Sequence, residues 1–236
     1  MILMILKSRI SMRTKACIFD LDGVIVDTAK YHYLAWKKLA VMLNIQFSGE
    51  DNERLKGVSR MASLDIILEI GKMTPDDRMK EEYAALKNKW YLDYIGRMTP
   101  EEILPGSLEF LSELKSAGIK TALGSASKNT PLILQRLGME SLFDAVADGN
   151  IVRNAKPDPE VFLTAAKMLG VLPENCVVFE DAIAGVESAL NAGMLCIGIG
   201  SEKILANAHY VITGLDKMSL KKLREIEKVS DNEQLL

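Results

Sequence analysis

The feature that most limits the fold is the regular alternation of apolar, strand-like runs and amphipathic, helix-like stretches from residue 104 onward. A glycine follows each amphipathic stretch, as it often does at a helix C-terminus, and an apolar run comes soon after. Such alternation is typical of a parallel sheet covered by helices. We therefore predict an α/β fold with a Rossmann-like, doubly wound, mostly parallel sheet, with strands over residues 16–21, 119–124, 143–146, 176–179, 195–199 and 210–213.

Residues 29–103 interrupt this alternation. Their apolar residues recur at spacings of three and four, which favours successive helices over residues 31–43, 59–70 and 75–95. The sequence therefore predicts an inserted α-helical cap domain whose two connections to the core form a hinge. The expected organisation is an N-terminal extension over residues 1–13, a Rossmann-like catalytic core over 14–28 and 104–236, and a helical cap over 29–103.

Composition excludes several classes of function. A formal net charge of −3 with scattered Lys and Arg residues gives no basic stripe for a nucleic acid. The apolar opening, residues 1–6, is far shorter than the ~20 residues of a membrane span, and its positive charges follow it, which reverses the order in a signal peptide. The three cysteines lie in apolar runs without metal-ligand spacing. We expect a cytoplasmic monomer that binds a small molecule and neither a nucleic acid nor a membrane.

Two carboxylates close the first predicted strand. Asp20 and Asp22 lie two residues apart after the apolar run Ala16–Phe19, and Gly23 follows where a tight turn is needed. Residues i and i+2 of a strand project from the same face, so both side chains would point into one site. Open α/β sheets bind ligands at this end of their strands. Asp-x-Asp is also a common turn pattern, but its place here predicts an active site that holds a cation.

Three further polar groups end predicted strands or follow them in loops: Ser125, Lys156 and the pair Glu180-Asp181. In a parallel sheet the carboxyl ends of the strands meet at one edge, so we expect these groups to converge with Asp20. Acidic oxygens together with water and phosphate favour Mg²⁺ over softer metals. The alternative for the acidic pair is a favourable charge at a helix N-terminus.

The segment Ser125–Asn129 offers hydroxyls, amides and a cation at the start of the next predicted helix, which suits an anion. Simple helix capping by Ser or Asn is the alternative, and both can hold together. Lys156 precedes Pro157 in a loop that would hold its ammonium group rigidly, although alone it would be an ordinary surface lysine.

Together these four motifs resemble the haloacid dehalogenase superfamily of phosphotransferases, whose signature is an Asp-x-Asp strand end, a Ser or Thr strand end, a lysine and an acidic pair. The resemblance implies that Asp20 is a nucleophile that becomes an aspartyl phosphate and that Asp22 is the general acid and base. It implies a Mg²⁺ site made by Asp20, the backbone carbonyl of Asp22, and Asp181, with Glu180 close by. Ser125 and Lys156 would hold the transferring phosphate.

The predicted cap resembles the caps of sugar-phosphate mutases in this superfamily. His32 follows Thr28 by one helical turn, and the resemblance implies that it helps to position Asp22 for proton transfer. The expected catalytic residues are therefore Asp20, Asp22, Thr28, His32, Ser125 and Lys156. Arg60 would bind a second phosphate from the cap, with Ser127, Lys128 and Asn129 facing it from the core, and thereby make closure depend on substrate. The expected substrate-binding residues are Trp36, Lys56, Gly57, Val58, Ser59, Arg60, Lys87, Ser125, Ala126, Ser127, Lys128 and Asn129. Each of three cap residues also has a purely structural interpretation. Trp36 would pack inside the helical segment, whereas His32 and Arg60 would be solvated residues on helix surfaces.

The expected reaction interconverts β-D-glucose 1-phosphate and β-D-glucose 6-phosphate through phospho-Asp20 and β-glucose 1,6-bisphosphate, which serves as intermediate and activator. A sugar-phosphate phosphatase would use the same Asp20, Asp22 and Mg²⁺, and the core motifs do not separate the two. A non-catalytic sugar-phosphate sensor is a more distant alternative, because binding alone requires neither a nucleophile nor an acid–base group.

Overall fold

The computed structural model describes residues 14–233, so the predicted extension over residues 1–13 lies outside the described residues. A six-stranded sheet forms the centre of the molecule, and every pair of neighbouring strands is parallel. The strand order is β3-β2-β1-β4-β5-β6. This confirms the predicted doubly wound α/β fold. The strands are β1 (Ala16–Phe19), β2 (Lys120–Gly124), β3 (Ala145–Ala147), β4 (Cys176–Glu180), β5 (Leu195–Ile199) and β6 (Tyr210–Ile212).

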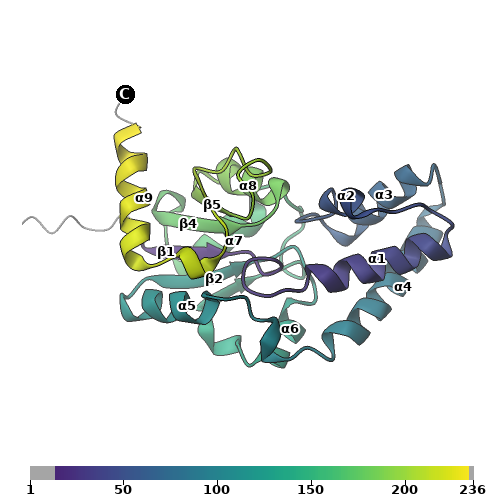
Figure 1. The fold of residues 1–236 in the computed structure, drawn as a ribbon, viewed down its shortest axis with the longest axis horizontal. Helices are drawn as coiled ribbons and strands as arrows, with labels where there is room; N and C mark the ends of the chain where they lie inside the picture. The colour runs from purple at the N-terminus through teal and green to yellow at the C-terminus, as the bar shows by residue number, and fades with distance from the viewer. Residues whose placement is uncertain (1–13, 234–236) are drawn as a thin grey trace, which may run out of the picture.

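Helices cover both faces of the sheet (Figure 1). Cys17 and Phe19 of β1 pack in one apolar cluster with residues of α5, α6 and α9, whereas Ala16 and Ile18 pack in another with residues of α7 and α8. Alternate residues of a strand face opposite sides, so a strand covered on both sides must be apolar throughout, as β1 is. The helices are α5 (Ser107–Ser116), α6 (Thr130–Leu137), α7 (Glu160–Leu169), α8 (Ile183–Asn191) and α9 (Leu220–Glu233).

Four helices separate β1 from α5 and lie beside the sheet at one end of the molecule (Figure 1). They have an apolar cluster of their own around Trp36, Leu39, Leu64 and Ile67. Three match the predicted helices, and the boundaries of the predicted cap domain stay a prediction. The helices are α1 (Ala29–Met42), α2 (Gly49–Glu53), α3 (Arg60–Ile70) and α4 (Asp77–Ile95).

The two connections between the helical segment and the sheet lie next to each other. Val26 forms an antiparallel bridge with Ile103. The N–H of Asp27 donates to the carbonyl of Glu102 at 2.8 Å, and the N–H of Leu104 donates to the carbonyl of Ile25 at 2.9 Å. The two connections of the helical segment, α1 to α4, are therefore held side by side.

Short 3-10 helices complete the secondary structure: η1 (Pro100–Glu102), η2 (Glu140–Leu142), η3 (Pro173–Asn175) and η4 (Leu215–Lys217). Within residues 14–233, no helix has the length and apolar character needed to cross a membrane.

Candidate active site

The carboxyl end of β1 carries the Asp20–Asp22 pair. Asp20 is 5% exposed, and its N–H donates to the carbonyl of Phe179 at 2.9 Å, so the backbone stays joined to β4 just beyond the strand. Asp22 is partly buried, and its Oδ1 accepts a hydrogen bond from the Thr28 hydroxyl. Burial and the negative charge of Asp20 raise the pKa of Asp22 to about 6, against the opposing effect of Thr28. Such a pKa suits a group that exchanges protons near neutral pH.

Lys156 joins two of the predicted carboxylates. Its Nζ lies 2.5 Å from Oδ1 of Asp20 and 2.5 Å from Oε1 of Glu180, and its side chain is fully buried. Burial alone would lower the pKa of Lys156, but the two carboxylates outweigh it and raise this pKa above its usual value. The Lys156-Pro157 peptide, whose state the sequence leaves open, is cis. The loop before α7 thus brings a fixed positive charge to the end of β1.

The acidic pair at the end of β4 reaches the same place. Glu180 is fully buried and also accepts a hydrogen bond from the N–H of Ala182 at 2.8 Å. Gly185 leaves the space that this carboxylate fills, since a Cβ there would overlap it. Burial raises the pKa of Glu180 to about 7. A Cβ at Gly23 would likewise overlap the carboxylate of Asp181, so Asp181 lies against the turn that follows Asp22.

The charges at this edge of the sheet are unbalanced. Burial and the charges of Glu180 and Asp20 raise the pKa of Asp181 well above its usual value. The ammonium group of Lys156 contacts Asp20 and Glu180, while Lys87 and Lys56 add positive charge near Asp22 and Asp181. The four carboxylates outnumber these three ammonium groups, of which Lys56 is also paired with Glu53. Within residues 14–233, no group of three or more His, Cys, Asp or Glu side chains is arranged to hold a metal ion by side chains alone. The predicted metal site also uses the backbone carbonyl of Asp22. Its ligands are all oxygen atoms and carry excess negative charge, which suits Mg²⁺.

The loop after β2 is shaped by its own serines. Ser125 is 1% exposed, and its hydroxyl accepts from the N–H of Ser127 at 3.1 Å. The hydroxyl of Ser127 accepts from the N–H of Asn129 at 3.1 Å. These bonds close turns within the loop, whereas the start of α6 has no side-chain cap, so the helix capping by Ser or Asn that the sequence allowed is not observed. The N–H of Ser125 donates to Ala147 of β3 at 3.0 Å, which fixes the loop to the sheet; Ala126 and Lys128 belong to the same turn before α6.

A buried cluster extends from Asp22 into the helical segment. Nε2 of His32 lies 3.9 Å from Oδ2 of Asp22, and Nδ1 lies 2.9 Å from Nζ of Lys87. Lys87 is 2% exposed and lies over the rings of Trp36 and Tyr91 at 4.5 and 4.7 Å. Trp36 is itself 2% exposed, so it supports Lys87 and has little surface left for a ligand.

Tyr91 belongs to this cluster, although no sequence motif marks it. Its ring centroid lies 4.1 Å from that of His32. Among the described residues, neither its hydroxyl nor Nε2 of His32 has a hydrogen-bond partner, although both are buried. Tyr91 follows Lys87 by one helical turn, and that spacing is the only signal that could have identified it. These two buried polar atoms beside Asp22 are a reason to place a polar ligand here.

The predicted cap motif forms the turn between α2 and α3. Gly57 has a positive φ of 71°, which favours glycine, and Ser59 caps α3 by accepting from the N–H of Ala62 at 3.2 Å, with Val58 between them. Lys56 is paired with Glu53 at 2.9 Å, and its charge also acts on Asp181. Arg60 is partly buried, and its positive charge helps to lower the pKa of Lys87 and of His32.

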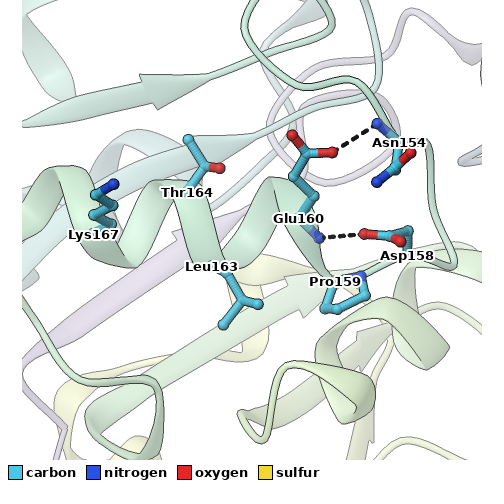
Figure 2. A pocket seen from close by; sticks show the side chains of 7 residues that line it. All are labelled: Asn154, Asp158, Pro159, Glu160, Leu163, Thr164 and Lys167. Atoms are coloured by element: carbon cyan, nitrogen blue, oxygen red, sulfur yellow. Dashed lines mark hydrogen bonds between the residues drawn. The ribbon is translucent and has the colours of Figure 1, made fainter.

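A separate hollow of about 340 Å³ lies on the surface of α7 (Figure 2). None of the predicted site residues lines it. Oε2 of Glu160 there accepts from the N–H of Asn154 at 2.7 Å, and Oδ1 of Asp158 accepts from the N–H of Glu160 at 2.9 Å. Because these carboxylates serve the backbone at the start of α7, we regard the hollow as structural.

Known proteins resemble this chain over most of its length. A β-phosphoglucomutase of Bacillus subtilis is 44% identical over 89% of this chain and 94% of its own length. A phosphorylated carbohydrates phosphatase of Thermotoga maritima is 32% identical over 76% of this chain and 82% of its own length. The crystal structure of a β-phosphoglucomutase from Clostridium difficile matches with a TM-score of 0.89 and 42% identity, over 92% of this chain and 99% of that one.

The match to a family reaches from the start of β1 through α8. Residues 14–193 match the haloacid dehalogenase-like hydrolases, and this span contains every predicted site residue. On this match and on the relatives above, the chain belongs to the haloacid dehalogenase-like hydrolase family.

Proposed function

We propose that the protein is a β-phosphoglucomutase, an isomerase that interconverts β-D-glucose 1-phosphate and β-D-glucose 6-phosphate. The observation that carries this proposal is the 44% identity to the Bacillus subtilis enzyme over 89% of the chain, which includes the helical segment as well as the sheet. A cytoplasmic, monomeric state stays a prediction from the sequence.

Asp20 is the proposed nucleophile. Lys156 holds Oδ1 of Asp20 at 2.5 Å, which leaves Oδ2 to attack phosphorus. A new bond forms between Oδ2 and phosphorus while the bond from phosphorus to the sugar oxygen breaks, so the phosphoryl group moves to Asp20. Lys156 and Ser125 are placed to stabilise the phosphoryl oxygens.

Asp22 is the proposed general acid and base. It gives a proton to the leaving sugar oxygen and takes one from the attacking sugar hydroxyl in the reverse transfer. Its pKa of about 6 allows both forms near neutral pH. The hydrogen bond from Thr28 holds Oδ1 and so orients the carboxylate, while Nε2 of His32 lies 3.9 Å from Oδ2.

The residues that would hold Mg²⁺ are Asp20, the backbone carbonyl of Asp22, and Asp181, with Glu180 beside them. When bound, the ion would offset the repulsion between the carboxylates and the phosphate.

Arg60 is the proposed anchor of the second phosphate, with Ser127, Lys128 and Asn129 as its proposed partners from the loop after β2. Its partly buried guanidinium group offers a planar set of donors that suits a phosphate. The buried ammonium group of Lys87 adds positive charge to this region, and burial and the Arg60 charge lower the pKa of Lys87 to about 7. With phosphates bound at both ends, β-glucose 1,6-bisphosphate is the proposed intermediate, and it must turn round between the two transfers.

A sugar-phosphate phosphatase is the second candidate. The 32% identity to the Thermotoga maritima phosphatase favours it, and the residues around Asp20 serve either reaction. The two functions differ only in whether phospho-Asp20 gives its group to a sugar hydroxyl or to water.

Nuclear magnetic resonance of phosphorus during turnover tests the proposal. The protein is incubated with β-D-glucose 1-phosphate, Mg²⁺ and a trace of β-glucose 1,6-bisphosphate, with α-D-glucose 1-phosphate as the control substrate. We expect glucose 6-phosphate from the β anomer alone. Release of inorganic phosphate without the 6-phosphate would establish the phosphatase instead.

A further inference from the structure

The helical segment, α1 to α4, contacts the rest of the protein through Gly57, a predicted substrate-binding residue, and Ala182, which belongs to no predicted site. A Cβ built on Gly57 would lie 2.9 Å from the Cβ of Ala182 and 3.7 Å from the backbone nitrogen of Gly185. The turn before α3 is therefore seated directly on the residues that begin α8. Ala182 is 3% exposed and Gly57 is partly buried. Gly57 is needed here for close approach, in addition to its positive φ of 71°.

A second contact joins α4 to the start of α6. Nδ2 of Asn129 donates to Oδ1 of Asn88 at 3.0 Å. The N–H of Asn129 is bound by the Ser127 hydroxyl at 3.1 Å, so the rest of this residue is fixed to the loop after β2. Asn88 is the residue next to Lys87 and thus links the buried cluster around Asp22 to that loop.

These two contacts lie on either side of the strand that carries Asp20. The helix α6 follows β2 and the helix α8 follows β4, and β1 lies between these strands in the sheet. The two helices also pack in different apolar clusters, on opposite faces of the sheet. The helical segment is thereby held over the end of β1 from both sides (Figure 1).

We propose that Ala182 and Asn88 are positioning residues that seat the helical segment on the sheet and so determine whether phospho-Asp20 transfers its group to a sugar or to water. The inference deepens the proposed function and rests on it. Transfer to a sugar and transfer to water use the same nucleophile and the same acid–base group. They differ in whether water reaches phospho-Asp20, which depends on how closely the helical segment packs against the sheet. A neutral hydrogen bond and one methyl contact are weak enough to open and close in every turnover.

The experiment measures the ratio of glucose 6-phosphate formed to inorganic phosphate released, with β-D-glucose 1-phosphate, Mg²⁺ and a trace of bisphosphate. Asn88→Leu removes the hydrogen bond at similar size, and Lys89→Ala alters the exposed neighbour on α4 as its control. Ala182→Val enlarges the side chain on which the turn before α3 rests, and Ile183→Val, at the exposed neighbouring position of α8, is its control. The rate at which Asp20 becomes phosphorylated is measured in parallel, and circular dichroism checks folding.

We expect the ratio to fall about 3- to 10-fold in Asn88→Leu, as the loss of one neutral hydrogen bond predicts, and at least as far in Ala182→Val. The ratio in Lys89→Ala and Ile183→Val should stay at the wild-type value. An unchanged ratio in folded Asn88→Leu and Ala182→Val would overturn the inference while leaving the mutase in place. If the wild type itself forms no glucose 6-phosphate, the proposed function fails, which is a distinct result.

Discussion

Lys156 shows how a single residue sets the electrostatics of the site. Its ammonium group is shared by Asp20 and Glu180 at 2.5 Å each, and all three side chains are almost or fully buried. Removing one partner of a buried ion pair leaves an uncompensated charge, which costs more than the pair contributes. Lys156 therefore stabilises the fold in addition to its proposed role in binding phosphate.

Lys156→Met should lower the free energy of unfolding by about 3–5 kcal/mol, because Asp20 and Glu180 would be left buried without their cation. Urea denaturation at pH 7.5 measures the loss. Lys115→Met, at an exposed position in the last turn of α5, is the control and should change stability by less than about 0.5 kcal/mol. Equal unfolding midpoints for the two variants would show that the buried pair does not stabilise the fold.

Asp20→Asn should abolish formation of the phosphoenzyme, because an amide cannot act as the nucleophile. Asp22→Asn should instead slow turnover by about 10²–10⁴-fold, which is the usual contribution of a general acid or base. Labelling with ³²P-phosphorylated substrate and rapid acid quench measures both. Normal labelling of Asp20→Asn would end the assignment of the nucleophile.

At the scale of elements, the sequence predicted the sheet well because its signals are local. The apolar runs and the glycines at helix ends mark strands and helices within a few residues of the observed bounds. The helix α2 was missed: its residues, Gly49–Glu53, bury no side chain, so there is no apolar periodicity to detect, and the capping box of Ser48 and Asp51 is its only mark. The first strand ends at Phe19, before the predicted Leu21.

Only part of the candidate active site could be predicted from the sequence, because only part of it depends on local signals. Asp20, Lys156 and Glu180 could be brought together from sequence because strand ends of a parallel sheet share one edge. The surroundings of Lys87 could not, because they depend on how α1 and α4 pack. Asn88 and Ala182 carry no motif at all, and only the arrangement of the helical segment against the sheet brings them into contact with Asn129 and Gly57.

The start of α5 depends on a glycine that faces another loop. Gly106 has a φ of 83°, and a Cβ there would overlap the backbone of Leu215 and Asp216. Gly106→Ala should therefore lower the free energy of unfolding by about 2–5 kcal/mol, from left-handed strain and from overlap together.

Gly138→Ala is the matched control for Gly106→Ala. Gly138 has a φ of 64° with nothing within 4 Å of an added Cβ, so its cost should be only the about 1–2 kcal/mol of left-handed strain. Denaturation of both variants in urea isolates the overlap with η4 as their difference. A difference near zero would mean that this loop moves freely away from α5.

The stability of the whole molecule should depend on pH through Lys87. Burial and the Arg60 charge lower the pKa of Lys87 to about 7 in the folded protein, against 10.5 in its ordinary state, while Asp22 opposes this effect. His32 and Tyr91 also face the ammonium group. Between these pH values the unfolded chain binds more protons, so the free energy of unfolding should rise with pH in this window.

Denaturation of the wild type and of Lys87→Met at pH 7 and pH 8.5 measures this contribution. The stability of the wild type relative to the variant should increase by about 1–2 kcal/mol across this interval, since each pH unit contributes at most about 1.4 kcal/mol per proton. A parallel response of the two proteins would show that Lys87 keeps an ordinary pKa in the folded state.

The bridge between Val26 and Ile103 affects how the helical segment can change during evolution. Because the two connections of the helical segment lie next to each other, the segment resembles a long surface loop whose ends are already joined by the framework. Changes in its length leave the two ends in place, whereas Ala35, Tyr91 and Ile95 pack its inner helices into the apolar cluster that contains Phe19. A phosphoryl-transfer framework can thereby acquire new substrates through changes in the outer part of the segment that covers it.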